Sequence, residues 1–118
     1  MVQYISEITD VPSYLKIGDE LGMPQVLAHG DVWSTNILWR QRDGQEGHEL
    51  LALVDYQTAH MGLPAGDLVR VMGACLSGKE RQENWEQLTE DFYGYLLEEL
   101  NGDEAPYTLE QVQGLLKI

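Results

Sequence analysis

The chain has 118 residues, the size of one small domain, and its 20 acidic against 7 basic side chains give a formal net charge of −13. Because nucleic acids and anionic lipids would repel such a chain, we expect neither a nucleic acid nor a membrane as partner. The hydrophobic fraction of 43% is enough for a packed core, which argues against extended disorder. The single cysteine excludes an internal disulfide, and no apolar run approaches about 18 residues, so we expect a cytoplasmic protein.

The first third of the chain predicts a short helix and then a short strand. Ser13 is a candidate N-cap, and apolar side chains at helical spacing continue to Leu21, before a Gly-Met-Pro stop. Residues 26–28 are apolar and lead into His29 and Gly30, which is typical of a brief buried strand that enters a loop.

A β-hairpin is predicted next. Two apolar runs, residues 36–39 and 50–54, flank a polar segment that contains an Asp-Gly turn signal. A hairpin tip near residues 45 and 46 would set Asn36 opposite Asp55. We expect Trp39 to lie in the core.

The remainder of the chain predicts three helices. Apolar positions recur at helical spacing through residues 65–76 and again through residues 85–100, where acidic side chains form a solvated face. Thr108 and Gln111 have the spacing of a capping box at the start of a last helix. Cys75 falls on the apolar face of its helix, so we expect a buried, inert thiol. The fold class expected from these elements is α+β, with helices around a small antiparallel hairpin.

The polar side chains that could carry chemistry gather at the open end of the predicted hairpin. Asp31 precedes it, Asn36 begins it and Asp55 follows it, so the loop before the hairpin can turn all three into one cleft. Phosphoryl transfer needs a carboxylate to receive the proton of the attacking hydroxyl and oxygen ligands for Mg²⁺. Asp31 suits the first role, and Asn36 and Asp55 suit the second. A metal-dependent hydrolase could use the same acids, and its test is phosphate release from simple esters without ATP.

The same residues resemble a known family of small-molecule kinases. His29-x-Asp31-x-x-x-x-Asn36 and Val54-Asp55-aromatic are similar to the catalytic loop and metal-binding motif of choline and aminoglycoside kinases. A longer match, over about residues 24–100, resembles the CHK-kinase-like (ecdysteroid-kinase-like) branch, and it includes Gly62-Leu63-Pro64-Ala65-Gly66-Asp67-Leu68. The chain departs from that branch at Tyr56, where Trp is more usual, and at Gly66, where an acid is more usual.

The resemblance implies a role for each matching residue. Asp31 would be the catalytic base or hydroxyl-orienting carboxylate, and Asn36 and Asp55 would hold Mg²⁺. His29 and Asp67 would support the catalytic loop without touching substrate, and Asp67 would be largely buried. The implied reaction transfers the γ-phosphate of ATP to a hydroxyl of a small molecule.

The resemblance also implies a missing partner. The amino-terminal lobe of these kinases supplies a glycine-containing phosphate loop, a strand lysine and a helix glutamate, and none of them is found in this sequence. Residues 1–118 are therefore expected to form a partial domain, the carboxy-terminal lobe of a protein-kinase-like fold, inactive by itself. The alternative is a kinase-derived fragment with a non-catalytic binding or regulatory role, and nucleotide titration separates the two.

Overall fold

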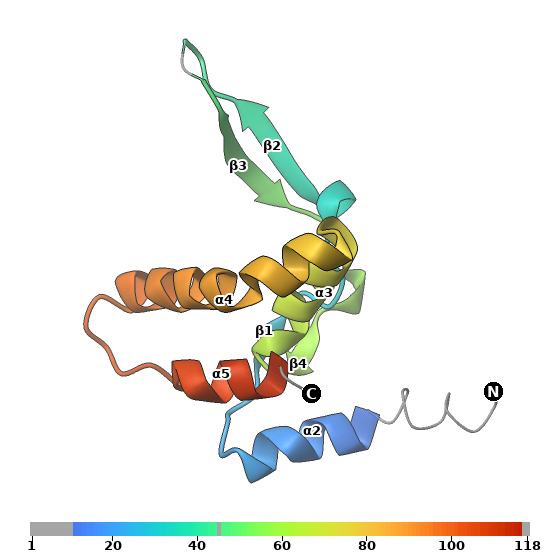
Figure 1. Cartoon of the computed structure of the whole chain (residues 1–118), viewed down its shortest axis with the longest axis vertical. Helices are drawn as coiled ribbons and strands as arrows, with labels where there is room; N and C mark the ends of the chain where they lie inside the picture. Colours follow the sequence, from blue (N-terminus) through green and yellow to red (C-terminus); the bar gives the residue numbers. More distant parts are fainter. Residues whose placement is uncertain (1–10, 45, 117–118) are drawn as a thin grey trace, which may run out of the picture.

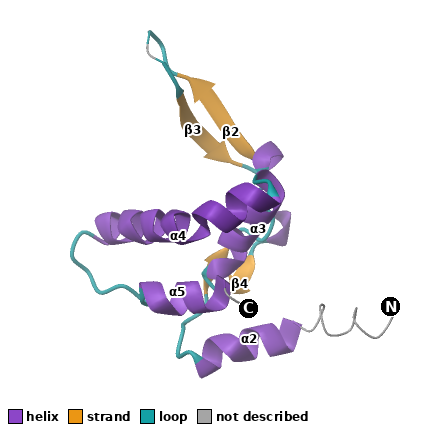
Figure 2. Ribbon diagram, viewed as in Figure 1, coloured by secondary structure: helices purple, strands orange, loops and turns teal. Residues whose placement is uncertain are grey.

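A computed structural model describes residues 11–44 and 46–116, and it shows a mixed α+β chain (Figures 1 and 2). The α-helices are α2 (Val11–Glu20), α3 (Ala65–Cys75), α4 (Gly78–Leu100) and α5 (Leu109–Leu116). The strands are β1 (Val26–Ala28), β2 (Ile37–Gln41), β3 (His48–Leu53) and β4 (His60–Gly62). Two short 3₁₀-helices, η1 (Ser34–Asn36) and η2 (Tyr56–Thr58), connect them. The predicted class is confirmed.

The strands form two separate antiparallel pairs. β1 pairs with β4, with Ala28 opposite His60, and β2 pairs with β3 in the predicted hairpin. Strand β4 was not expected, because three residues, one of them a glycine, carry almost no periodic signal.

The hairpin register differs from the predicted one. At the tip Gln41 pairs with His48, so the centre of the loop lies one residue earlier than expected and the strand partners are two residues from the predicted ones. A bulge between Leu38 and Trp39 then reduces this difference in partners to one residue. The Val54 N–H then donates to the Asn36 carbonyl at 3.0 Å. Val54 therefore lies opposite Asn36, at the position where Asp55 was predicted. Asp55 is the next residue along the chain.

Helix α2 confirms the expected helix but begins earlier. It is described from Val11, so Ser13 lies inside it and the predicted N-cap at Ser13 is wrong. Helix α4 also begins earlier than predicted, at Gly78.

The ends of the last two helices are stabilised by side-chain caps. The Ser77 hydroxyl accepts from the Glu80 N–H, and the Glu80 carboxylate accepts from the Ser77 N–H. Hydrogen bonding to the Ser77 side chain, and then to its backbone N–H, lowers the pKa of Glu80. The same reciprocal pair joins Thr108 and Gln111 before α5, as predicted. Asn101 ends α4 in the left-handed region with φ of 48°.

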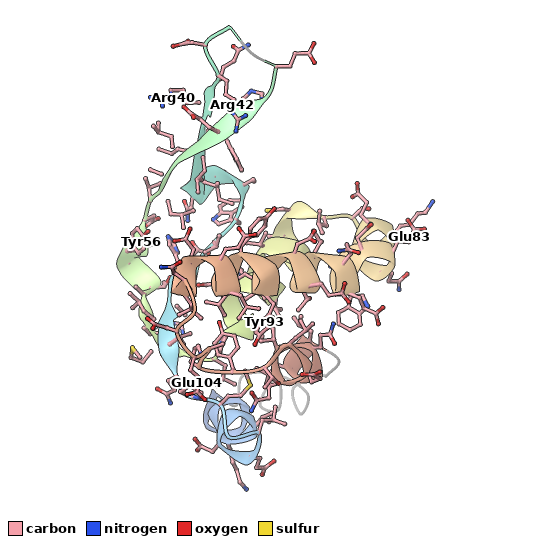
Figure 3. The ribbon with its side chains drawn as sticks, turned by 90° about the vertical axis from the view of Figure 1, so that its left-hand side faces the viewer. Arg40, Arg42, Tyr56, Glu83, Tyr93 and Glu104 are labelled. Atoms are coloured by element: carbon pink, nitrogen blue, oxygen red, sulfur yellow. The ribbon has the colours of Figure 1, made fainter. Side chains whose placement is uncertain are left out.

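One hydrophobic core joins the helices. Helix α5 runs back along α4, and α3 crosses the beginning of α4 (Figure 1). The core residues come from these helices and the segments beside them, and they are Met23, Leu63, Ala65, Tyr107, Val112 and Leu115. Tyr93 in Figure 3 lies between α4 and the segment before α5, and its hydroxyl donates to the Tyr107 carbonyl at 3.0 Å.

The β2–β3 hairpin projects away from the helices (Figures 1 and 3), with Arg40 and Arg42 on its outer part. Several apolar side chains of the hairpin are exposed: Leu38, Trp39, Leu50 and Leu51. Trp39 is 57% exposed, so its predicted place in the core is wrong, because no described element covers that face. Cys75 is also exposed rather than buried, since α3 ends there and the chain turns into α4. None of the described helices is long and apolar enough to cross a bilayer.

The central position of Leu63 gives a first prediction. Leu63 is 2% exposed and packs so closely on Gly18 that a Cβ there would lie 2.2 Å from its Cδ2 atom. We expect Leu63→Ala to lower the free energy of unfolding by about 2–5 kcal/mol, because it leaves a cavity in the core. Denaturant unfolding measures this, with Leu97→Ala, at a 46% exposed position of α4, as the matched control that changes little. Equal effects of the two substitutions would contradict the assigned core.

Candidate functional site

The loop between β1 and η1 turns sharply at Gly30. Its φ is +82°, and a Cβ at this position would lie 2.6 Å from the Thr58 carbonyl oxygen and 3.0 Å from its hydroxyl. Only glycine fits both the conformation and the space. The pairing of β1 with β4 causes this crowding, because it brings the end of η2 against the start of the loop.

The backbone of this loop is held by Asp67, in the first turn of α3. Its carboxylate accepts hydrogen bonds from the His29 N–H at 2.8 Å and from the Gly30 N–H at 2.9 Å. These amides have left the β1 ladder and need other acceptors. Asp67 thus points at the loop as the sequence analysis expects, but it is half-buried rather than largely buried.

His29 ties the loop to the end of the hairpin. Its ring is 5% exposed and lies 4.3 Å from the Tyr56 ring between centroids. The Nε2 atom is 2.9 Å from the Val54 carbonyl oxygen, which can only accept, so Nε2 carries the proton. Nδ1 then accepts from the Asp31 N–H at 3.3 Å. The Thr58 hydroxyl donates to the His29 carbonyl at 3.2 Å.

The structure brings Asp31 and Asn36 into contact. Asn36 is buried at the end of η1, and its Nδ2 donates to the Asp31 carbonyl at 2.9 Å and to the Asp31 Oδ2 at 3.3 Å. Because Nδ2 makes both contacts, Oδ1 is the atom of Asn36 that can bind a cation. The other carboxylate oxygen of Asp31 accepts from the guanidinium of Arg70, on α3, at 2.5 Å.

Asp55 lies at the open end of the hairpin but is not joined to these side chains. It has a left-handed backbone, with φ of 66°, and it is exposed directly after Val54. Its recorded hydrogen bond, at 3.4 Å, comes from the Gln57 amide. The hydrogen bonds described in residues 11–44 and 46–116 include none from the Asp55 side chain to Asp31 or Asn36.

The donor set suits one kind of cation. No group of three or more His, Cys, Asp or Glu side chains with metal-binding geometry occurs in the described part of the chain. Mg²⁺ normally takes only one or two protein oxygens, and the Asn36 amide oxygen and the Asp55 carboxylate are ligands of that type. The described residues therefore offer oxygen donors of the type that Mg²⁺ takes, on Asn36 and Asp55.

Arg70 is the site residue that the sequence analysis missed. It follows Asp67 by three residues, so the two side chains share one face of α3. That spacing from a residue assigned to the loop was a signal that could have identified it.

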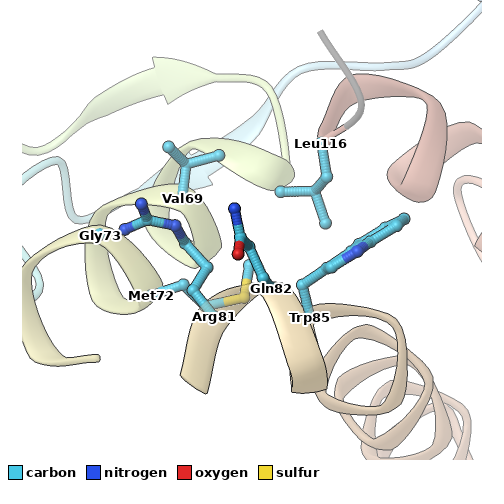
Figure 4. A pocket seen from close by; sticks show the side chains of 7 residues that line it. All are labelled: Val69, Met72, Gly73, Arg81, Gln82, Trp85 and Leu116. Atoms are coloured by element: carbon cyan, nitrogen blue, oxygen red, sulfur yellow. The ribbon is translucent and has the colours of Figure 1, made fainter. Parts of the chain in front are cut away.

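Several cavities border α3. One, of about 340 Å³, lies beside the loop and is lined in part by Gly30, Asp67, Val69 and Arg70. Another, of about 450 Å³, lies between α3, α4 and the end of α5 (Figure 4), and its lining includes Met72, Trp85 and Leu116.

Comparison with known proteins decides the family. Residues 1–118 match the family DUF1679, which carries the description "Uncharacterized oxidoreductase dhs-27". The chain belongs to this family. It is also 28% identical over 98 residues to the "Uncharacterized kinase-like protein D1044.1" of Caenorhabditis elegans. That match covers 83% of the chain and 24% of the relative, so the chain spans about a quarter of the relative's length. No solved structure matches. The kinase-like relationship is thus supported at a coarse level.

The two hydrogen bonds to Asp67 give a second prediction. Asp67→Ala leaves the His29 and Gly30 amides without their acceptor, and we expect a loss of about 1–3 kcal/mol in the free energy of unfolding. Thermal unfolding measures it, and Asp19→Ala, at an exposed position of α2, is the control. An unchanged melting temperature would show that Asp67 does not brace the loop.

Gly30 gives a third prediction. Gly30→Ala places a methyl group against the Thr58 carbonyl in an unfavourable backbone conformation, so we expect a clear loss of stability. Gly94→Ala is the matched control: Gly94 lies inside α4 with open space around it, and its replacement should stabilise the protein by about 0.5–1 kcal/mol. Melting curves of the two variants should therefore move in opposite directions, and a parallel shift would refute the proposed crowding.

Proposed function

We propose that this chain carries the catalytic loop and metal ligands of a small-molecule phosphotransferase of the CHK-kinase-like type. The proposed reaction transfers the γ-phosphate of ATP to a hydroxyl of a small molecule. The observation that carries the proposal is the contact of Asp31 with Asn36 in a loop whose backbone is held by Asp67. The kinase-like relative adds independent support.

Each side chain has a distinct part in the proposed mechanism. Asp31 accepts a hydrogen bond from the acceptor hydroxyl and receives its proton as the oxygen attacks the γ-phosphorus of ATP and ADP leaves. Asn36 holds the Asp31 carboxylate through Nδ2 and offers Oδ1 toward the cation. His29 and Asp67 keep the loop in place while the proton moves. Mg²⁺ held by Asn36 and Asp55 would neutralise charge on the phosphates of ATP.

The length of the kinase-like relative supports a site that is formed by two lobes of a longer protein. The chain matches 24% of that protein, and the residues that usually hold the α and β phosphates are not found in this sequence. We propose that the rest of a longer protein supplies them as an amino-terminal lobe. The exposed apolar side chains of the hairpin would suit a surface that this lobe covers.

Two other functions are weaker. A non-catalytic binding or regulatory role is favoured by the small share of the relative that the chain covers. The word oxidoreductase in the family description finds less support: the 118 residues contain no Gly-x-Gly-x-x-Gly run, and both described sheets are antiparallel pairs. The proposed phosphoryl transfer uses Asp31 and Asn36, whose side chains are in contact.

A fourth prediction tests the proposal. We expect the 118-residue chain to bind Mg²⁺·ATP weakly and to form no ADP, as calorimetry and a coupled ADP assay can show. In a chimera, the chain replaces the matching segment of the Caenorhabditis elegans relative, and we propose that the rest of that protein supplies the missing phosphate contacts. This protein should form ADP with hydroxyl acceptors such as choline or a sterol alcohol.

Substitution of the proposed base then decides the mechanism. Asp31→Asn in the chimera should lower kcat by about 10²–10⁴-fold, because the carboxamide cannot receive the proton. Asp43→Asn, in the exposed hairpin loop, is the control with unchanged rate. A fully active Asp31→Asn chimera would refute the role of Asp31. Robust ADP formation by the 118-residue chain alone, sensitive to Asp31→Asn, would show that it needs no second lobe.

A further inference from the structure

The ion pair between Arg70 and Asp31 is not explained by the family resemblance or by the comparisons. Arg70 lies on α3, 39 residues after Asp31, and its guanidinium contacts Oδ1. The Asp31 side chain is 21% exposed and that of Arg70 is 53% exposed. The contact thus joins a partly shielded carboxylate to a cation at the border of the cavity beside the loop.

Among the described residues, Arg70 is the basic side chain that forms an ion pair with this loop. The chain has seven Lys and Arg side chains against 20 acids, and the other recorded ion pairs lie within helices α2 and α4 or on the hairpin. Those pairs are exposed and of little energetic weight. Arg70 differs because its partner is the proposed base.

The two oxygens of Asp31 are held from opposite parts of the fold. Arg70 on α3 donates to Oδ1, and Asn36 at the end of η1 donates to Oδ2. A carboxylate with one donor can still rotate about its side-chain bonds, whereas two donors from rigid elements define its plane. Proton transfer requires the accepting oxygen within about 2.6–3.2 Å of the hydroxyl, so a defined plane matters for the reaction.

Helix α3 provides both fixed points of the loop. Asp67 in its first turn holds the backbone of His29 and Gly30, and Arg70 one turn later reaches the side chain of the next residue, Asp31. Because both lie on one helix face, the position of the backbone and the direction of the carboxylate are set together.

We propose that Arg70 is a positioning residue that orients the Asp31 carboxylate for the acceptor hydroxyl, with α3 as the rigid support. The proposal rests on the phosphotransferase function proposed above. The main competing role follows from the cavity: a guanidinium at its border could instead bind an anionic substrate group directly. The two roles predict different kinetics.

The orientation itself is tested on the 118-residue chain, without any activity. The side-chain amide of Asn36 contacts Asp31 and reports on its direction through its nitrogen and proton chemical shifts. We expect Arg70→Gln to shift these resonances and to speed their hydrogen exchange about fivefold or more, while Arg70→Lys, which keeps the charge, retains part of the effect. Arg81→Gln, on α4, removes the same charge elsewhere and should leave the Asn36 signals unchanged.

Backbone amide spectra separate orientation from unfolding. If Arg70→Gln unfolds the chain, the Asn36 signals of a folded Arg70→Lys variant are compared with those of the unsubstituted chain instead. Unchanged Asn36 signals in a folded Arg70→Gln variant overturn the proposal. This result is independent of ATP turnover, so it does not depend on whether the chain is a kinase.

Kinetics of the chimera described above distinguish positioning from substrate binding. We expect Arg70→Gln to lower kcat about tenfold or more with the KM values for ATP and acceptor within about twofold, and Arg70→Lys to restore part of the rate. A raised KM with unchanged kcat overturns the proposal and makes Arg70 a binding residue. If the chimera shows no turnover that depends on Asp31, the phosphotransferase function is refuted. The Asn36 amide signals then still report whether Arg70 orients Asp31.

Discussion

The double hydrogen bond from the loop amides of His29 and Gly30 to the Asp67 carboxylate is the interaction on which the arrangement of the site depends. Strand β1 ends at Ala28, so these amides leave their sheet in a turn that only glycine can make. An acceptor with a charge, fixed in the first turn of a helix, satisfies both and also lies favourably near the positive end of the α3 dipole. The loop and α3 therefore behave as one unit.

Other contacts extend this unit to the hairpin. His29 donates to the Val54 carbonyl at the end of the hairpin, and Val54 in turn donates to Asn36 at its beginning. The buried imidazole of His29 thus links Asp31, the proposed base, to Val54, and Val54 links them to Asn36. Asp55 itself remains outside this network in the described contacts, and its left-handed backbone points to a strained position at the edge of the site. A cation bound between Asn36 and Asp55 would complete the connection.

The hairpin has a different relation to the fold. It pairs internally and projects from the helices, and its apolar side chains meet solvent on faces that a longer protein could cover (Figures 1 and 3). The helical part, in contrast, closes its own core around Leu63 and Val112. The site lies where these two parts meet, between the beginning of α3 and the open end of the hairpin.

Local signals in the sequence determined the α+β class, the hairpin, the three later helices and the capping pair of Thr108 and Gln111, because turn residues, periodicity and capping pairs act within a few residues. The proximity of Asp31 and Asn36 also followed from their spacing. The register of the hairpin did not, since the bulge and the position of the tip depend on side-chain packing along the two strands. The same limit applied to exposure: Cys75 and Trp39 have apolar neighbours in sequence, but whether another element covers them is a property of the whole fold. Only the tertiary structure decided that Arg70 meets Asp31, because that ion pair joins residues from separate elements through the packing of α3 against the loop.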